Sequence, residues 1–179
     1  NSDNVIKELD AIANIDLTTR QIKESKSQVN IIRLGTSGAL QEDVPVDSLV
    51  MSSYGLGLDG LLNFYKSKDV IDDDITDAFI EHMVWGTELS KPYIVKASDF
   101  LTETLGGGMI TGITATAPGF YGPQGRVLRL PVAYPEQNDK ISSFSFNGKR
   151  ILNYEMETSA LYGLGKMLGH NTCTVCAMI

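Results

Sequence analysis

Short apolar segments alternate along this chain with segments of helical periodicity, and this alternation constrains the fold more than any other feature of the sequence. Residues 29–34 and 171–179 are apolar runs of strand length, whereas residues 157–168 repeat their apolar side chains at helical spacing. Strands that alternate with helices are typical of α/β folds. We therefore predict an α/β domain with a largely parallel or mixed sheet. The other predicted strands are residues 48–53, 109–116 and 151–154.

Two more helices are predicted where apolar periodicity follows polar residues. The candidate N-caps of the first helix are Ser2, Asp3 and Asn4, and its apolar positions are Val5, Ile6, Leu9, Ile12 and Ile15. The second helix follows the acidic run 72–74, and its apolar positions are Ile75, Ala78, Phe79, Met83 and Trp85. Acidic side chains complement the dipole at a helix N-terminus, so we interpret the run as a solvated cap and not as a cation site.

The size and charge of the chain narrow its classes of partner. It has 179 residues, enough for one domain with a substantial core, and a formal net charge of −7. A surface of this sign disfavours binding to a nucleic-acid backbone or to an anionic membrane. No apolar run reaches the roughly 18 residues that a membrane helix needs.

Several residues that could suggest a metal or phosphate site do not support one. Cys173 and Cys176 are too few for a disulfide framework, which is typical of a reducing cytoplasm. Residues three apart on a strand point to opposite faces, so we predict two core thiols. His82 and His170 add too few ligands for zinc, and no metal is predicted. The glycines at 106–108 lack the lysine and the Ser/Thr of a P-loop and are interpreted as a flexible loop.

Both ends of the sequence look interrupted. The chain begins at Asn1, not at a methionine, and it stops at Ile179 inside an apolar run. A strand that ended there would leave backbone polar groups unsatisfied. We therefore expect residues 1–179 to be one partial domain that is truncated at both ends.

The segment 119–126 gathers an aromatic ring, a carboxamide and a guanidinium on a glycine-rich backbone. Phe120 can lie against a flat ring, Gln124 can both donate and accept hydrogen bonds, and Arg126 can donate to a carbonyl oxygen or an anion. These groups suit a heterocycle that carries carbonyls and a ring N–H, such as uracil. The alternative is a surface turn with an exposed aromatic side chain.

Two further segments carry groups suited to a phosphate and a sugar. Arg33 ends a predicted strand and is followed by a predicted turn over residues 35–38. Its guanidinium can donate two hydrogen bonds to a phosphate, and the N–H groups and hydroxyls of the turn can donate to the same anion. Glu155 and Glu157 flank Met156 at a predicted strand-to-helix junction. An ionised carboxylate only accepts hydrogen bonds, so one of them can accept from two ribose hydroxyls. The alternatives are a structural ion pair for Arg33 and an acid-rich helix N-terminus for the two glutamates.

Taken in order, the segments 32–38, 120–126 and 153–157 resemble the uridine phosphorylases of nucleoside phosphorylase family I. The resemblance covers most of the chain and is weakest over residues 63–105. The R-x-G-T-[ST]-G and E-M-E elements are shared widely in that family, whereas the F-Y-x-x-Q-x-R element is narrower and points to uridine.

The resemblance implies roles for three groups of residues. Those at the phosphate would be Arg33 and Thr36. Those at the base would be Phe120 on the uracil ring, with Gln124 and Arg126 reading its carbonyls and N3–H. Those that approach the nucleoside or line its ribose would be Thr36, Ser37, Gly38, Tyr154, Glu155, Met156 and Glu157, with Glu157 accepting from the hydroxyls. The catalytic groups would be Arg126, Gln124 and Arg33.

The resemblance also implies a reaction and an architecture. The reaction is phosphorolysis of uridine to uracil and ribose 1-phosphate, with inorganic phosphate as co-substrate and no organic cofactor. The architecture is a single three-layer domain, with a central mixed, mostly parallel sheet flanked by helices, assembled as a homodimer or homohexamer. The family's N-terminal phosphate loop and C-terminal helix would lie outside this chain. The alternatives are a purine nucleoside phosphorylase, a nucleosidase, a catalytically silent nucleoside-binding relative, and a structural domain whose motifs are accidental.

Overall fold

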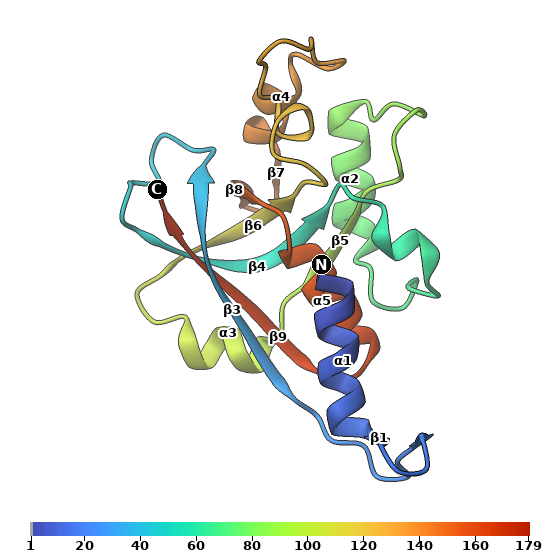
Figure 1. The fold of residues 1–179 in the computed structure, drawn as a ribbon. Coiled ribbons are helices and arrows are strands. Elements are labelled where there is room, and N and C mark those ends of the chain that lie inside the picture. The colour runs from blue at the N-terminus through green and yellow to red at the C-terminus, as the bar shows by residue number, and fades with distance from the viewer. Residues whose placement is uncertain (1) are drawn as a thin grey trace.

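In the computed structural model, which describes residues 2–179, five strands form a mixed sheet that closes on itself (Figure 1). The strands of the ring, in spatial order, are β3 (Asn30–Ala39), β9 (Asn171–Met178), β4 (Leu49–Gly57), β6 (Ile110–Thr116) and β8 (Lys149–Glu155). The ring closes because the end of β3 pairs with β8, with Gly38 opposite Tyr154 and Ala39 opposite Asn153. Two short strands extend the sheet, β5 (Tyr93–Lys96) beside β4 and β7 (Ser145–Phe146) beside β8.

Parallel and antiparallel pairs are combined in this sheet. The pairs β3–β9, β4–β6 and β6–β8 are parallel, and the pairs β3–β8, β4–β9, β4–β5 and β7–β8 are antiparallel. The predicted α/β domain with a mixed sheet is therefore confirmed. The predicted three layers are corrected, because a sheet that curls into a barrel-like ring places the helices around its outside.

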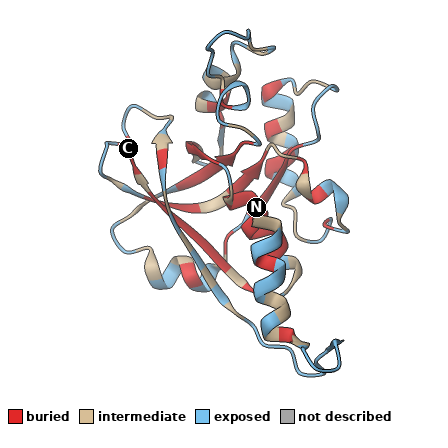
Figure 2. Ribbon diagram, in the orientation of Figure 1, coloured by how far each residue is buried: buried red, intermediate tan, exposed pale blue. Residues whose placement is uncertain are grey.

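Helices surround the ring and connect its strands. They are α1 (Ser2–Asn14), α2 (Asp73–Met83), α3 (Asp99–Leu105), α4 (Gln137–Ser143) and α5 (Thr158–Met167), with short 3-10 turns η1 (Leu61–Phe64) and η2 (Gly122–Gln124). A small hairpin of β1 (Ile15–Asp16) and β2 (Gln21–Ile22) follows α1. Residues 158–165 of α5 are all buried, whereas α1 lies outside α5 and exposes one side (Figure 2). Across residues 2–179, no helix is both long and apolar enough to cross a bilayer.

The predicted turn at residues 35–38 is wrong, because these residues continue β3. Gly35, Thr36 and Ser37 pair with β9, and Gly38 pairs with β8. Neither glycine adopts the left-handed backbone that a tight turn would use. Two partner strands hold the backbone here, β9 along residues 35–37 and β8 at Gly38, and this pairing over long sequence distances overrides the local preference of Gly, Thr and Ser for turns.

The predicted helices that follow acidic residues are confirmed. Asp72 takes the N-cap position of α2, which buries Ile75 and Phe79, and Glu157 takes the same position before α5. The first helix is also confirmed, although Asn1 lies outside the described residues. Its apolar positions are not all covered: Ile6 is buried, whereas the exposed ones are Val5, Leu9 and Ile12. Two predicted apolar positions lie beyond the helix ends, since Ile15 is in β1 and Trp85 follows the end of α2 at Met83.

The core is divided among strands and helices as the apolar pattern indicates. One cluster joins α2 and α4 to the strands through Phe79, Ile141 and Ile151, and another joins α1, α5 and β5. Cys173 and Cys176 are free and buried in two different clusters, which confirms the prediction of two core thiols.

Gly55 of β4 lets the sheet approach the start of α5 closely. A Cβ at this position would lie 3.1 Å from Ser159 Cα and 3.2 Å from Ser159 N. The Ser159 N–H donates to Thr116 Oγ1 at 2.9 Å, so the helix cannot retreat without losing this bond. We expect Gly55→Ala to lower the free energy of unfolding, measured in urea, by about 1–2 kcal/mol. Gly107→Ala is the matched control, since nothing lies within 4 Å of a Cβ there, and an equal loss in both variants would contradict the prediction.

Candidate active site

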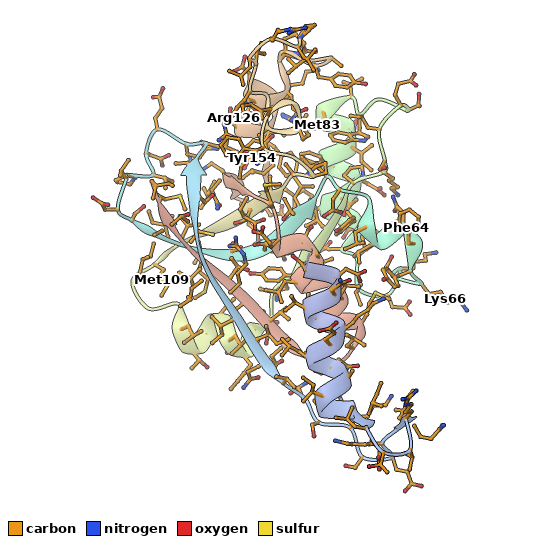
Figure 3. All side chains as sticks on the ribbon, viewed as in Figure 1. Phe64, Lys66, Met83, Met109, Arg126 and Tyr154 are labelled. Carbon is orange, nitrogen blue, oxygen red and sulfur yellow. The ribbon has the colours of Figure 1, made fainter. Side chains whose placement is uncertain are left out.

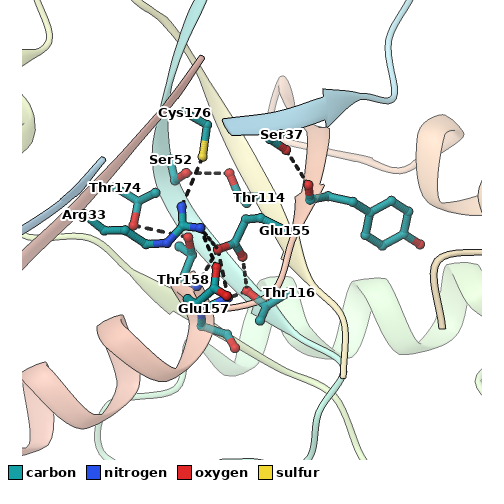
Figure 4. Close-up of polar contacts among 12 residues, drawn as sticks. Arg33, Ser37, Ser52, Thr114, Thr116, Glu155, Glu157, Thr158, Thr174 and Cys176 are labelled. Carbon is teal, nitrogen blue, oxygen red and sulfur yellow. Dashed lines mark hydrogen bonds and ion pairs between the residues drawn. The ribbon is translucent and has the colours of Figure 1, made fainter. Parts of the chain in front are cut away.

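Arg33 forms the centre of a polar cluster on the inner side of β3 (Figure 4). Its side chain folds along the strand over Gly35, where a Cβ would lie 2.5 Å from Arg33 Nη1. Nη2 forms an ion pair with Glu157 and lies 3.5 Å from Glu155 Oε2. Nη1 donates to Cys176 Sγ at 3.4 Å. Because Gly35 has no side chain, the guanidinium of Arg33 has space to approach the two carboxylates.

The two carboxylates differ in their surroundings. The side chain of Glu155 is 2% exposed, whereas that of Glu157 is 44% exposed. Burial raises the pKa of the Glu155 carboxyl, although the hydrogen bond from Thr116 and the charge of Arg33 oppose the shift. Burial alone would lower the pKa of Arg33, but the charges of Glu155 and Glu157 outweigh it and raise that pKa. Arg33 thus stays charged, and Glu157 is the carboxylate that solvent or a ligand can reach.

Phe120, Gln124 and Arg126 lie together in the loop that follows β6. The guanidinium of Arg126 lies 4.1 Å from the centroid of the Phe120 ring, within the range of a cation–π contact. Arg126 Nη1 donates to the Phe120 carbonyl oxygen at 2.8 Å and to Gln124 Oε1. Gly125 takes the left-handed conformation, with φ of 71°, and this reverses the chain between Gln124 and Arg126. The three groups named from the sequence are therefore brought together.

Side-chain amides of α4, a helix that we did not predict from the sequence, hold the loop in place. Asn138 Nδ2 donates to the Gln124 carbonyl oxygen at 3.1 Å, and Gln137 Nε2 donates to the Pro123 carbonyl oxygen at 2.8 Å. The same Gln137 Nε2 donates to the Tyr154 hydroxyl at 3.2 Å. These amides lie in a polar stretch without apolar periodicity, so no signal in the sequence marked them.

The loop and the Arg33 cluster meet where β3 closes onto β8. A Cβ at Gly38 would lie 4.0 Å from Arg126 Nη2, and Gly38 pairs with Tyr154. Figure 3 shows Arg126 and Tyr154 close together at this end of the sheet. Burial raises the pKa of Tyr154 to about 12, against the opposing effects of Gln137 and Arg126. Gly35 and Gly38 are three residues apart, about 10 Å along an extended strand, and residues at this spacing point to opposite faces, so the two arginines approach opposite ends and different faces of one short stretch of β3.

The remaining predicted residues have different exposures. Met156 is 42% exposed between the two glutamates, and Thr36 is exposed on the face of β3 opposite to Arg33. The Ser37 hydroxyl is buried; it donates to the Tyr154 carbonyl oxygen and accepts from Asn153 Nδ2 at 2.9 Å. Ser37 thus helps to close the ring, while Thr36 and Met156 keep accessible side chains.

A cavity of about 590 Å³ lies along the outer side of the loop. Its walls are mostly apolar and include Trp85, Leu128 and Pro131, with Arg126 and Gln137 at its polar edge. Of the predicted site residues, Arg126 lines this cavity, whereas Arg33 and Glu157 do not. The cavity therefore borders the loop at Arg126 and does not include the Arg33 cluster. Within residues 2–179, no group of three or more His, Cys, Asp or Glu side chains could hold a metal ion.

The fold and the site together define a class of protein. A family model of the phosphorylase superfamily matches residues 12–179. The chain belongs to that superfamily.

Two known proteins are similar to this chain. It is 29% identical over 156 residues to a uridine phosphorylase of Thermococcus kodakarensis, and the match covers 82% of this chain and 47% of that protein. A crystal structure of a Trypanosoma brucei nucleoside phosphorylase, which is said to show uridine phosphorylase activity, superposes with a TM-score of 0.79 at 24% identity. That match covers 98% of this chain and 65% of the other, so the likeness establishes the fold. The chain spans about half the length of the curated relative that it matches.

Proposed function

We propose that this chain carries the nucleoside site of a uridine phosphorylase, which cleaves uridine reversibly with inorganic phosphate to uracil and ribose 1-phosphate. The observation that carries the proposal is the closure of β3 onto β8, which sets Arg126 beside Gly38 and Arg33 beside Glu157. Groups suited to a uracil ring and to a sugar phosphate thus share one stretch of strand. The relative from Thermococcus kodakarensis bears the same activity in its name.

In the proposed reaction, a phosphate oxygen bonds to C1′ while the bond from C1′ to the base nitrogen breaks. The electron pair of that bond moves onto uracil, which then takes a proton from solvent. Arg126 and Gln124 would stabilise the negative charge as it develops on the base, and this lowers the barrier more than binding of the neutral ring does. Arg33 would hold the phosphate near C1′ and supply proximity, and Glu157 would accept from the ribose hydroxyls. Inorganic phosphate is a co-substrate here, and the proposal includes no organic cofactor.

The proposal is tested by uracil release from uridine with and without phosphate, using the full chain, with inosine in parallel. Release that requires phosphate and favours uridine is the expected result. Release without phosphate would identify a nucleosidase, and a preference for inosine would identify a purine nucleoside phosphorylase. Binding of uridine without release would identify a catalytically silent relative. Any of these three outcomes would overturn the proposed activity.

Gln124 is proposed to read the uracil edge. Its backbone is fixed by Asn138, its Oε1 accepts from Arg126, and the residue is 4% exposed, so its carboxamide is oriented before a ligand arrives. We expect Gln124→Ala to reduce the preference for uridine over cytidine by about tenfold or more, because a fixed polar group rejects a ring that leaves it unpaired. Ratios of kcat/KM for the two nucleosides measure this preference. An unaltered ratio would remove Gln124 from base recognition.

The homodimer or homohexamer implied by the family resemblance is also proposed for this chain. Exposed apolar side chains on two neighbouring elements support it: Val5, Leu9 and Ile12 on α1, and Ile32 and Leu34 on β3. Light scattering of the full chain tests it, and a monomer at micromolar concentration would contradict it. The two free, buried thiols are consistent with the proposed cytoplasmic location.

A further inference from the structure

The carboxylate of Glu155 is buried and hydrogen-bonded within the protein, which is typical of a group that fixes the backbone and not of one that binds a ligand. Its Oε1 accepts from Thr116 Oγ1 at 2.6 Å. Its Oε2 accepts from the backbone N–H groups of Glu157 and Thr158, each at 2.9 Å. A carboxylate has about four acceptor sites. With three of these taken and a side chain that is 2% exposed, Glu155 has little capacity left for sugar hydroxyls.

These hydrogen bonds satisfy the start of α5. The first N–H groups of a helix have no partner within the helix. Glu155 accepts from those of Glu157 and Thr158, and Thr116 Oγ1 accepts from that of Ser159 at 2.9 Å. A carboxylate at this end also complements the helix dipole. Glu155 and Thr116 therefore fix the backbone of Glu157, whose own side chain makes no capping hydrogen bond.

The same carboxylate also orients Arg33. Its Oε2 lies 3.5 Å from Arg33 Nη2, the nitrogen that is paired with Glu157 (Figure 4). One buried group thus contacts both residues that the proposed function assigns to ribose and phosphate. We propose that Glu155 is a positioning residue, which holds Glu157 and Arg33 in place and does not touch the sugar. This inference rests on the proposed function and goes beyond it by separating the two glutamates of the E-M-E element.

The test compares Glu155→Gln with Glu157→Ala in the full chain, with uridine and 2′-deoxyuridine as substrates. Glutamine keeps an acceptor for the two N–H groups but removes the charge that faces Arg33. We expect Glu155→Gln to keep the thermal midpoint while kcat falls about tenfold, since misplacement of reacting groups lowers the rate. If kcat falls only as far as the thermal midpoint falls, the role of Glu155 is purely structural and the proposal is wrong. An unchanged kcat would also overturn the proposal.

Comparison of uridine with 2′-deoxyuridine distinguishes a residue that positions its neighbours from one that contacts the sugar. Glutamine keeps the oxygen that accepts from the Glu157 N–H, so the Glu157 carboxylate should stay in place, and Glu155→Gln should keep the ratio of kcat/KM for uridine to that for 2′-deoxyuridine within about twofold. Glu157→Ala should reduce this ratio clearly. If Glu155→Gln reduces it as much as Glu157→Ala does, Glu155 touches the sugar and the proposal is wrong.

Hydrogen exchange gives a reading that does not depend on turnover. The amides of Glu157 and Thr158 should exchange about tenfold faster in Glu155→Ala than in wild type, and at the wild-type rate in Glu155→Gln. Unchanged exchange in the alanine variant would overturn the anchoring. A wild-type chain that releases no uracil would overturn the proposed function alone, because the exchange rates would still decide whether Glu155 anchors α5.

Discussion

Replacement of Arg126 by alanine is expected to lower kcat/KM for uridine phosphorolysis by about 100-fold or more, which corresponds to about 3 kcal/mol of transition-state stabilisation. The reason is the charge that develops on uracil as the glycosidic bond breaks. Arg126 lies at the Phe120 ring and is already tied to Gln124, so its guanidinium needs little reorganisation to meet that charge. Most of the loss should fall on kcat and not on KM, because the neutral ring of the ground state gains less from a cation.

The measurement is the initial rate of uracil release over a range of uridine concentrations at saturating phosphate. Arg129→Ala is the matched control, because Arg129 lies three residues along the same exposed loop and lines the same cavity. Arg126→Lys separates charge from shape: a lysine keeps a point charge but cannot fork between two acceptors. We expect the lysine variant to recover only part of the lost rate. A wild-type kcat/KM in Arg126→Ala would remove this residue from catalysis.

The elements with strong local signals were predictable from the sequence. An acidic cap before apolar residues at helical spacing identified α2, and the strand-to-helix junction at Glu155–Glu157 identified the start of α5. The side chains that meet in the loop were also predictable, since Phe120, Gln124 and Arg126 are separated by few residues and a single left-handed glycine reverses the chain between them.

The closure of the sheet was not predictable in this way. Gly35 to Gly38 have the composition of a turn, and only β9 and β8, which lie more than a hundred residues away in sequence, hold them extended. Local propensity is a weak guide where partner strands that are distant in sequence satisfy the backbone. The helix α4 was not predicted for a related reason: its Gln137 and Asn138 contact the carbonyl oxygens of Pro123 and Gln124, and such amide contacts have no periodic signal in the sequence.

The different burial of Glu155 and Glu157 could not be predicted from the sequence either. From composition alone, Glu155 and Glu157 are equivalent carboxylates on either side of Met156. Their side chains are 2% and 44% exposed, and it is Glu155 that accepts from Thr116 at the end of a neighbouring strand. Sequence reasoning named both residues as candidates, but the pairing of β6 with β8, which sets Thr116 opposite Glu155, is needed to tell them apart.

Replacement of Arg33 by alanine is expected to have the second large effect, a loss of about 100-fold or more in kcat/KM for phosphate. In the free chain Arg33 is paired with Glu157, so in the proposed reaction binding of both substrates would exchange partners: phosphate would take the guanidinium, and the ribose hydroxyls would take the carboxylate. Without Arg33 the phosphate loses a forked donor, and it meets two carboxylates with no cation between them. The apparent KM for phosphate should therefore rise more than that for uridine. Arg150→Ala, which breaks the surface pair with Asp43, is the matched control.

The same variant should show a pH-dependent loss of stability. The charge of Arg33 lowers the pKa of Glu155 against the effect of burial, so in Arg33→Ala that pKa rises further above the ordinary value of 4.5. A carboxyl whose pKa is raised in the folded state favours folding while it is protonated, and this advantage is lost as the pH rises through the folded-state pKa. The deficit of the variant in the free energy of unfolding should therefore be small near about pH 4 and larger near about pH 7. Urea denaturation at both values measures it. A deficit that does not change with pH would mean that Arg33 stabilises the fold by packing, and that its charge is not what compensates Glu155.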